Sequence, residues 1–117
     1  MTARVVLVVD DHPVNRMLAT VLLRDAGRQY AEAADGEEAL KKLSEGEYDT
    51  VLLDISMPGI SGYEVCKRIR ADERLRRLRV IAYTAHALDT EREKIMAAGF
   101  DAVLIKPINR KALLSVL

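Results

Sequence analysis

Short, uninterrupted apolar runs alternate with amphipathic segments along the whole of this 117-residue sequence. The runs VVLVV, VLL and VLI lack the polar–apolar alternation of a strand that is exposed on one face. Continuous runs of this length are typical of parallel strands that are covered on both faces. The strand candidates are Arg4–Asp10, Tyr30–Ala34, Thr50–Asp54, Val80–Thr84 and Ala102–Lys106. The second of these is the least apolar, which predicts an edge strand.

Each strand candidate is followed by a segment with apolar residues at helical spacing. The order is therefore strand–helix repeated five times, which predicts an α/β sheet with right-handed crossovers and helices on both faces. Capping boxes predict that two of the helices begin at Ser61, with Glu64 three residues later, and at Thr90, with Glu93. Asn109 is a candidate N-cap for the last helix.

The composition excludes several classes of protein. Half of the residues are hydrophobic and no repeat or linker divides residues 1–117, so we expect one domain with a proper core. Lys plus Arg number 18 and Asp plus Glu number 18, so no net charge favours nucleic acid or an anionic membrane as a partner. No apolar run is long enough to span a bilayer, and the N-terminal apolar run ends in acidic residues, so we expect no cleavable signal in it. The lone Cys66 permits no internal disulfide and suits a reducing cytosol, which predicts a cytoplasmic protein.

Polar side chains stand at the ends of four of the strand candidates. The first ends in Asp10-Asp11, the third in Asp54, the fourth in Thr84 and the fifth in Lys106. Because the carboxyl ends of parallel strands meet at one rim of the sheet, we expect these groups to converge there. Adjacent carboxylates repel each other, and an oxygen-preferring divalent cation such as Mg²⁺ would offset that repulsion. An ammonium and a hydroxyl could bind the oxygens of a phosphoryl group on one carboxylate; without such an anion, Lys106 could simply pair with the acids.

The sequence resembles the receiver domain of bacterial response regulators over essentially its whole length. Four motifs carry the resemblance, in the order and at the spacing of that family: Asp10-Asp11, Asp54 in LLDISMPGISGYE, Thr84-Ala85 after VIAY, and Lys106-Pro107. The resemblance implies a flavodoxin-like, doubly wound, five-stranded parallel sheet with strand order 2-1-3-4-5. DDHPVNR and AYTAHA are most similar to receivers of phosphorelays and hybrid sensor kinases.

The resemblance also implies a phosphoacceptor and a metal site. A phosphohistidine on a histidine kinase or a histidine phosphotransfer protein would donate its phosphoryl group to Asp54, the nucleophile. Asp11, Asp54 and the backbone carbonyl of Ser56 would bind Mg²⁺, with Asp10 acting through water. A downstream effector is a second class of partner, and weak dimerisation stays open.

Further residues of the family's switch can be assigned in the same way. Lys106 and Thr84 would bind the phosphoryl oxygens, and Ala85 would leave room for the Thr84 hydroxyl to approach. The peptide bond between Lys106 and Pro107 is expected to be cis, an isomer that proline makes accessible. The domain would catalyse its own phosphorylation and slow dephosphorylation, but it would act as a switch rather than as a metabolic enzyme.

One position departs from the family pattern. Three residues before the lysine, many receivers carry Tyr or Phe, which swings inward when the threonine moves; this sequence has Val103. The usual threonine–aromatic coupling is therefore not expected here. His12 and His86 are interpreted as surface side chains near the site, although His86 lies where it could influence water attack on the phosphoryl group.

Three alternatives to a free-standing receiver stay open. The first is a receiver cut from a larger response regulator or hybrid kinase. The second is an aspartyl-phosphate phosphohydrolase, which normally needs an acid two residues after the nucleophile, where this sequence has Ser56. The third is a pseudo-receiver that serves only as an interaction module; such domains usually lack an acid, the threonine or the lysine, all of which are present here.

Overall fold

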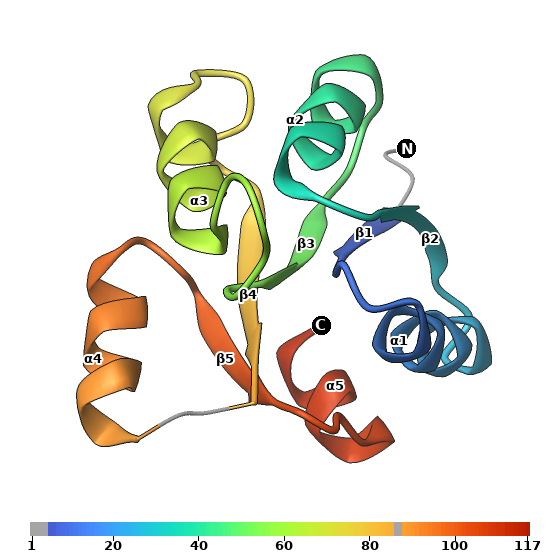
Figure 1. Ribbon diagram of the computed structural model, residues 1–117. Helices are drawn as coiled ribbons and strands as arrows, with labels where there is room; N and C mark the ends of the chain where they lie inside the picture. The colour runs from blue at the N-terminus through green and yellow to red at the C-terminus, as the bar shows by residue number, and fades with distance from the viewer. Residues whose placement is uncertain (1–4, 86–87) are drawn as a thin grey trace.

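The computed structural model describes residues 5–85 and 88–117, which form a parallel sheet between two layers of helices (Figure 1). The strands are β1 (Val5–Val9), β2 (Gln29–Ala33), β3 (Thr50–Asp54), β4 (Arg79–Thr84) and β5 (Ala102–Ile105). The helices are α1 (Pro13–Asp25), α2 (Gly36–Glu45), α3 (Gly62–Ala71), α4 (Asp89–Ala97) and α5 (Arg110–Val116). Strands and helices alternate as predicted. None of the described helices is long and apolar enough to cross a membrane.

The five strands lie in the order β2-β1-β3-β4-β5, which confirms the predicted 2-1-3-4-5 arrangement. β2 is an edge strand, as its polar sequence predicted, whereas β1 and β3 at the centre are almost completely buried. Two strand ends were predicted wrongly: Asp10 and Lys106 lie just after β1 and β5, not within them. β2 begins and ends one residue earlier than predicted, and β4 begins one residue earlier. An apolar run does not show where the last ladder hydrogen bond forms, so ends shift by a residue.

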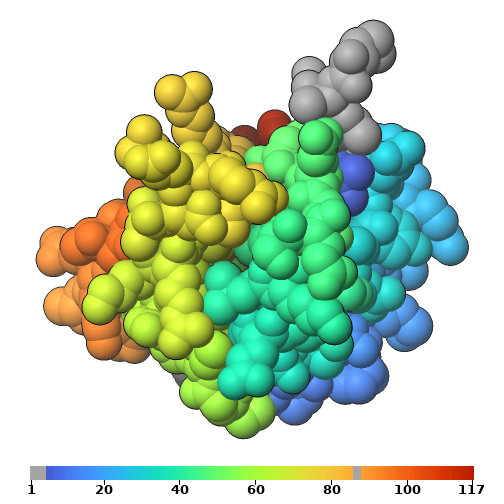
Figure 2. Space-filling model, turned by 90° about the horizontal axis from the view of Figure 1, so that it is seen from above, coloured from blue at the N-terminus to red at the C-terminus, as the bar shows by residue number. Residues whose placement is uncertain are grey.

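Helices cover both faces of the sheet, and each face has its own core. Side chains of successive strand residues point to opposite faces. Val6 and Val8 therefore pack with α1 and α5, while Leu7 and Val9 pack with α2, α3 and α4. Figure 2 shows α2 and α3 side by side, with α4 beyond α3. Burial on both faces explains why the central strands are apolar without alternation.

Two of the three predicted helix caps are present. The Ser61 side chain accepts a hydrogen bond from the backbone N–H of Glu64 at the start of α3, and the Asn109 side chain caps α5. The predicted cap at Thr90 is wrong. α4 begins one residue before Thr90, and its N-cap position is Leu88, which makes no side-chain cap. Acidic residues in the first turn of α4 stabilise its N-terminus electrostatically instead.

Arg70, near the end of α3, binds the segments that precede β4 and β5 and so connects them to α3. Its guanidinium donates to the Gly99 carbonyl at 3.0 and 2.8 Å, and to the carbonyls of Arg76 and Leu78 at 2.8 and 2.6 Å. It also pairs with the Asp101 carboxylate at 2.8 Å. Gly99 lies two residues after the end of α4, so this contact ties the carboxyl end of α4 to α3.

Candidate functional site

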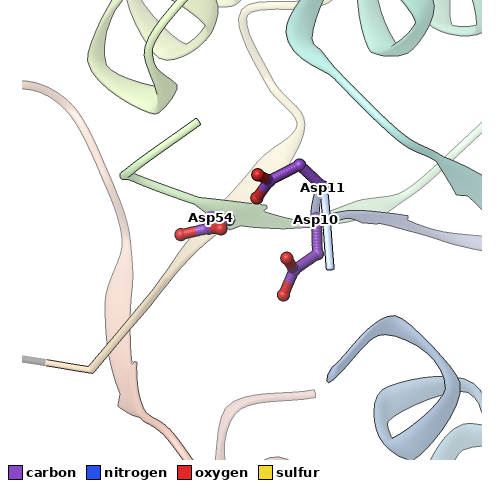
Figure 3. Close-up of side chains that lie close together, drawn as sticks. All are labelled: Asp10, Asp11 and Asp54. Atoms are coloured by element: carbon purple, nitrogen blue, oxygen red, sulfur yellow. The ribbon is translucent and has the colours of Figure 1, made fainter. Parts of the chain in front are cut away.

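The sheet brings the three acids predicted from the sequence to one rim, at the carboxyl ends of its strands. Asp10 and Asp11 follow β1, and Asp54 is the last residue of the neighbouring β3. Carboxylate oxygens from the three residues all lie within 4.8 Å of one another. Figure 3 shows the three side chains gathered at the ends of these two strands. Asp10 and Asp54 are only 0 % and 2 % exposed, so much of the negative charge is removed from bulk water.

Lys106, which follows β5, places an ammonium group against this acidic cluster. Its Nζ atom lies 3.2 Å from Asp10 Oδ2 and 3.2 Å from Asp54 Oδ2. These ion pairs offset part of the desolvation and repulsion of the two aspartates. Even so, Asp10 Oδ2 and Asp11 Oδ1 are buried and accept no hydrogen bond from the described residues. Buried carboxylate oxygens in this state suit a hard divalent cation.

Neighbouring groups fix the orientation of two of the carboxylates. The backbone N–H of His12 donates to Asp10 Oδ1 at 2.8 Å, and that of Ser56 donates to Asp54 Oδ1 at 3.1 Å. Arg16 Nη1 donates to the backbone carbonyl of Asp10 at 2.7 Å, which holds the turn between β1 and α1. In both aspartates one oxygen is thus bound by the backbone, and the other faces the ammonium.

Burial raises the pKa of the Asp54 carboxyl from 3.8 to about 6. The Lys106 charge opposes this shift, and the negative charge of Asp10 adds to it. Asp54 is therefore mostly ionised at neutral pH, yet it is more basic than an exposed aspartate. The ionised carboxylate is the form that acts as a nucleophile or as a metal ligand.

Replacing Asp54 by Asn is expected to stabilise the metal-free domain at neutral pH. The pKa of Asp54 is higher in the folded state than in the unfolded state, so the ionised carboxylate destabilises the fold. The full destabilisation is present at pH values well above 6. This destabilisation is lost as the pH falls from about 6 towards 4. The shift is equivalent to about 3 kcal/mol. The neutral amide lacks this penalty but does not reproduce every contact of the carboxyl group, so we expect a gain of roughly 1–2 kcal/mol at pH 7.5.

Urea unfolding without divalent cations, at pH 7.5 and at pH 4.5, measures this difference. Asp25→Asn, at the exposed end of α1, is the matched control and should not gain stability at pH 7.5. A gain for Asp54→Asn that stayed the same at pH 4.5 would contradict the raised pKa.

A cleft of about 280 Å³ opens above the acidic cluster. Its lining residues are His12, Asn15, Asp54, Ser56, Thr84, Ala85 and Lys106. The Asp54 carboxylate can therefore be reached from outside although the residue is buried. Thr84 is nearly buried and Ala85 is exposed beside it, and the Lys106–Pro107 peptide bond is cis. His86, which the sequence placed near this cleft, lies outside the described residues.

The roles of two residues at the site were not predicted from the sequence. A Cβ atom at Gly62 would lie 2.4 Å from the Asp54 carbonyl oxygen and 2.7 Å from Ile55 Cα, so α3 can start against the end of β3 only because this residue is glycine. Tyr83 lies inside an apolar run and has the pattern of a core residue, but its ring centroid lies 4.4 Å from Lys106 Nζ. Both roles depend on close contacts between segments that are distant in sequence, and the spacing of residues along the chain does not reveal such contacts.

Residues 6–117 match the family described as the response regulator receiver domain. The chain is 42 % identical over 108 residues to the sensor histidine kinase RcsC of Salmonella typhi, which is 92 % of this chain and 11 % of that protein. It is 43 % identical over 113 residues to the virulence sensor protein BvgS of Bordetella pertussis, which is 92 % of this chain and 9 % of that protein. The chain thus spans about a tenth of the length of these relatives.

Solved structures show the same fold. The chemotaxis protein CheY4 of Vibrio cholerae superposes with a TM-score of 0.91 at 31 % identity, over 99 % of this chain and 100 % of that one. The receiver domain of the sensor histidine kinase PA1611 of Pseudomonas aeruginosa, which has a magnesium ion coordinated in its active-site cleft, gives 0.89 at 36 % identity, over 98 % and 94 % of the two chains. The family match and these structural similarities extend over nearly the whole chain. The chain therefore belongs to the response regulator receiver domains of two-component phosphorelay signalling.

Proposed function

We propose that residues 1–117 act as one receiver domain in which Asp54 accepts a phosphoryl group from a phosphohistidine of a partner protein. The observation that carries this proposal is the Asp54 carboxylate itself, which is buried, open to the cleft and 3.2 Å from the Lys106 ammonium. In the transfer, an Asp54 oxygen forms a bond to phosphorus while the P–N bond of the phosphohistidine breaks. The released imidazole takes up a proton, and the product is an acyl phosphate that water later hydrolyses.

The acidic cluster fits Mg²⁺. We assign Asp11, Asp54 and the backbone carbonyl of Ser56 as its ligands, with Asp10 acting through water. Two observations support this assignment: every donor is an oxygen, and two buried carboxylate oxygens of Asp10 and Asp11 lack hydrogen bonds from the described residues. When bound, Mg²⁺ would supply positive charge that neutralises the phosphoryl oxygens.

Lys106 and Thr84 are the proposed partners of the phosphoryl oxygens. The Lys106 ammonium already contacts the Asp54 carboxylate, so a small displacement brings it to a phosphoryl oxygen on the same residue. Thr84 lies at the end of the adjacent strand and lines the cleft. The small side chain of Ala85 leaves space for that hydroxyl to approach.

The proposed donor is a histidine kinase or a histidine phosphotransfer protein, because the relatives named above are sensor proteins that include a histidine kinase. The response is passed to a downstream effector or along a phosphorelay. We place these reactions in the cytoplasm, in keeping with the buried free thiol of Cys66. A receiver that forms part of a larger sensor kinase or response regulator fits the same observations.

Incubation with acetyl phosphate and Mg²⁺ separates this proposal from its alternatives. A receiver accumulates a labile acyl phosphate, which borohydride reduces to homoserine at the modified aspartate, and mass spectrometry then locates that residue. A phosphohydrolase consumes the donor rapidly without accumulating an adduct, and a pseudo-receiver does neither. Ser56 argues against the hydrolase, since a hydroxyl is a poor general acid. Modification of any residue other than Asp54 would overturn the proposal.

Activation is expected to move the loop after β4 and the start of α4 while β5 stays almost still. Val103 is β-branched, with one stiff side-chain torsion, and cannot follow Thr84 as an aromatic ring would. Beryllofluoride with Mg²⁺ mimics the phosphoryl group, and amide chemical shifts report the change. We expect large shifts between residues 84 and 96 and small ones at Val103 and Leu104. Shifts as large at Val103 as at Ala85 would show that the strand takes part in the switch.

A further inference from the structure

The side chain of Tyr83 lies against the site from within the α1–α5 core. Tyr83 is only 1 % exposed and precedes Thr84 on β4, where it pairs with Asp54 in the strand register. Its ring centroid lies 4.4 Å from Lys106 Nζ, within the range of a cation–π contact. The ammonium therefore contacts an aromatic ring in addition to the two carboxylates.

The Tyr83 hydroxyl is held as firmly as the ring. It donates to the backbone carbonyl of Asn15, in the first turn of α1, at 3.2 Å. Burial raises the pKa of the phenol, and the charges of Asp10 and Asp54 raise it further, so the hydroxyl remains a donor. This bond fixes the ring between β4 and α1 and satisfies a polar group that would otherwise be buried without a partner.

The ring differs from the carboxylates in how it responds to phosphorylation. The contact between Lys106 and Asp54 must change when a phosphoryl group or a cation binds the same carboxylate. The Tyr83 ring is neutral, is not a metal ligand and does not compete for the new anion. It can therefore hold the ammonium in place before and after the transfer, which matters because lysine is a flexible side chain with a large rotamer entropy.

We propose that Tyr83 is a positioning residue for Lys106: its ring keeps the ammonium beside Asp54 so that the ammonium is in place for the incoming phosphoryl group. This inference rests on the proposed function of Asp54. If Tyr83 only filled the core, its replacement by leucine and its replacement by phenylalanine would have the same effect on the position of Lys106. The two substitutions therefore separate positioning from packing.

Three variants make the test. Tyr83→Leu removes the ring, and Tyr83→Phe removes the hydroxyl but keeps the ring. Tyr63→Leu is the matched control, because Tyr63 makes a similar contact with Lys94 Nζ at 5.0 Å, away from the acidic cluster. For each variant, the rate of adduct formation with acetyl phosphate at saturating Mg²⁺ is compared with that of the wild type. The resonances of the lysine ε-methylene groups are recorded without any phosphate donor.

In the wild type, the Lys106 ε-methylene signal should be shifted upfield by the ring current of Tyr83. We expect Tyr83→Leu to lose this shift and to react about tenfold more slowly, in line with a cation–π contact removed from solvent. Tyr83→Phe should restore the shift and most of the rate relative to Tyr83→Leu. Tyr63→Leu should react at the wild-type rate and keep the Lys106 signal.

The inference is overturned if Tyr83→Leu reacts as fast as the Tyr63→Leu control, or if Tyr83→Phe is as slow as Tyr83→Leu. Should Tyr83→Leu fail to fold, the wild-type spectrum decides, since an unshifted Lys106 signal excludes the ring contact. If the wild type takes up no phosphoryl group, the proposed function of Asp54 fails. The Lys106 signal then still shows whether the ring holds the ammonium.

Discussion

Asp54→Asn and Asp54→Ala are expected to abolish phosphorylation from acetyl phosphate and from phosphohistidine donors alike. An amide or a methyl group offers no nucleophilic oxygen, and loss of an essential nucleophile typically lowers a rate by on the order of 10³-fold or more. The neighbouring acids are not expected to substitute. Of the three acids, Asp54 is the one that lines the cleft, and Asp10 is completely buried.

Radiolabelled donors and intact-protein mass spectrometry measure this loss. Asp25→Asn is again the control, because it removes an exposed carboxylate far from the rim and should be labelled like the wild type. Unfolding cannot account for the loss, since Asp54→Asn is expected to be the more stable protein at neutral pH. Label that persisted on another residue in Asp54→Asn would refute the assignment of the acceptor.

Asp11→Ala is expected to weaken Mg²⁺ binding by more than about tenfold. Changes in residues that merely support a metal ligand cost roughly 10- to 100-fold in affinity, and loss of a direct carboxylate ligand should cost at least as much. Asp11 also contributes a buried oxygen that accepts no hydrogen bond from the part of the chain that the structure describes, so a cation can bind this oxygen without breaking one. Phosphorylation should fall together with Mg²⁺ affinity and recover partly at high Mg²⁺.

The sequence contains no tryptophan, so Mg²⁺ titrations are best followed by amide chemical shifts at the ends of β1 and β3. His12→Ala is the matched control. The His12 backbone N–H, not its side chain, contacts Asp10, so this variant should bind Mg²⁺ like the wild type. Equal affinity in Asp11→Ala and the wild type would remove Asp11 from the proposed ligand set.

The architecture was predictable because it depends on features that lie along the chain. Central strands buried on both faces must be continuously apolar, and the polar edge strand was recognisable for the opposite reason. The carboxyl ends of parallel strands meet at one rim, so Asp10, Asp54 and Lys106 could be placed together before any coordinates were known. The strand order came from the family resemblance, since periodicity alone does not specify it.

The unpredicted features depend on contacts between segments that are distant in sequence. Tyr83 is indistinguishable from a core residue until the ammonium of Lys106 is placed above its ring. Gly62 has the spacing of an ordinary helical residue, and its need for a missing Cβ arises only from the approach of α3 to β3. Thr90 was misplaced because a capping-box pattern one residue inside a helix looks the same as one at its start.

The Arg70 contacts have a mechanical consequence for signalling. They fasten the carboxyl end of α4, through the Gly99 carbonyl, to α3 and to the amino ends of β4 and β5. The amino end of α4, at Asp89, follows the carboxyl end of β4, where Thr84 lines the cleft, and has no cap from a side chain. A helix that is held at one end can rotate as a rigid body about that end. If Thr84 moves on phosphorylation as we propose, displacement of α4 would be greatest at Asp89 and decline towards Ala97, so that the outer surface of α4 would tilt.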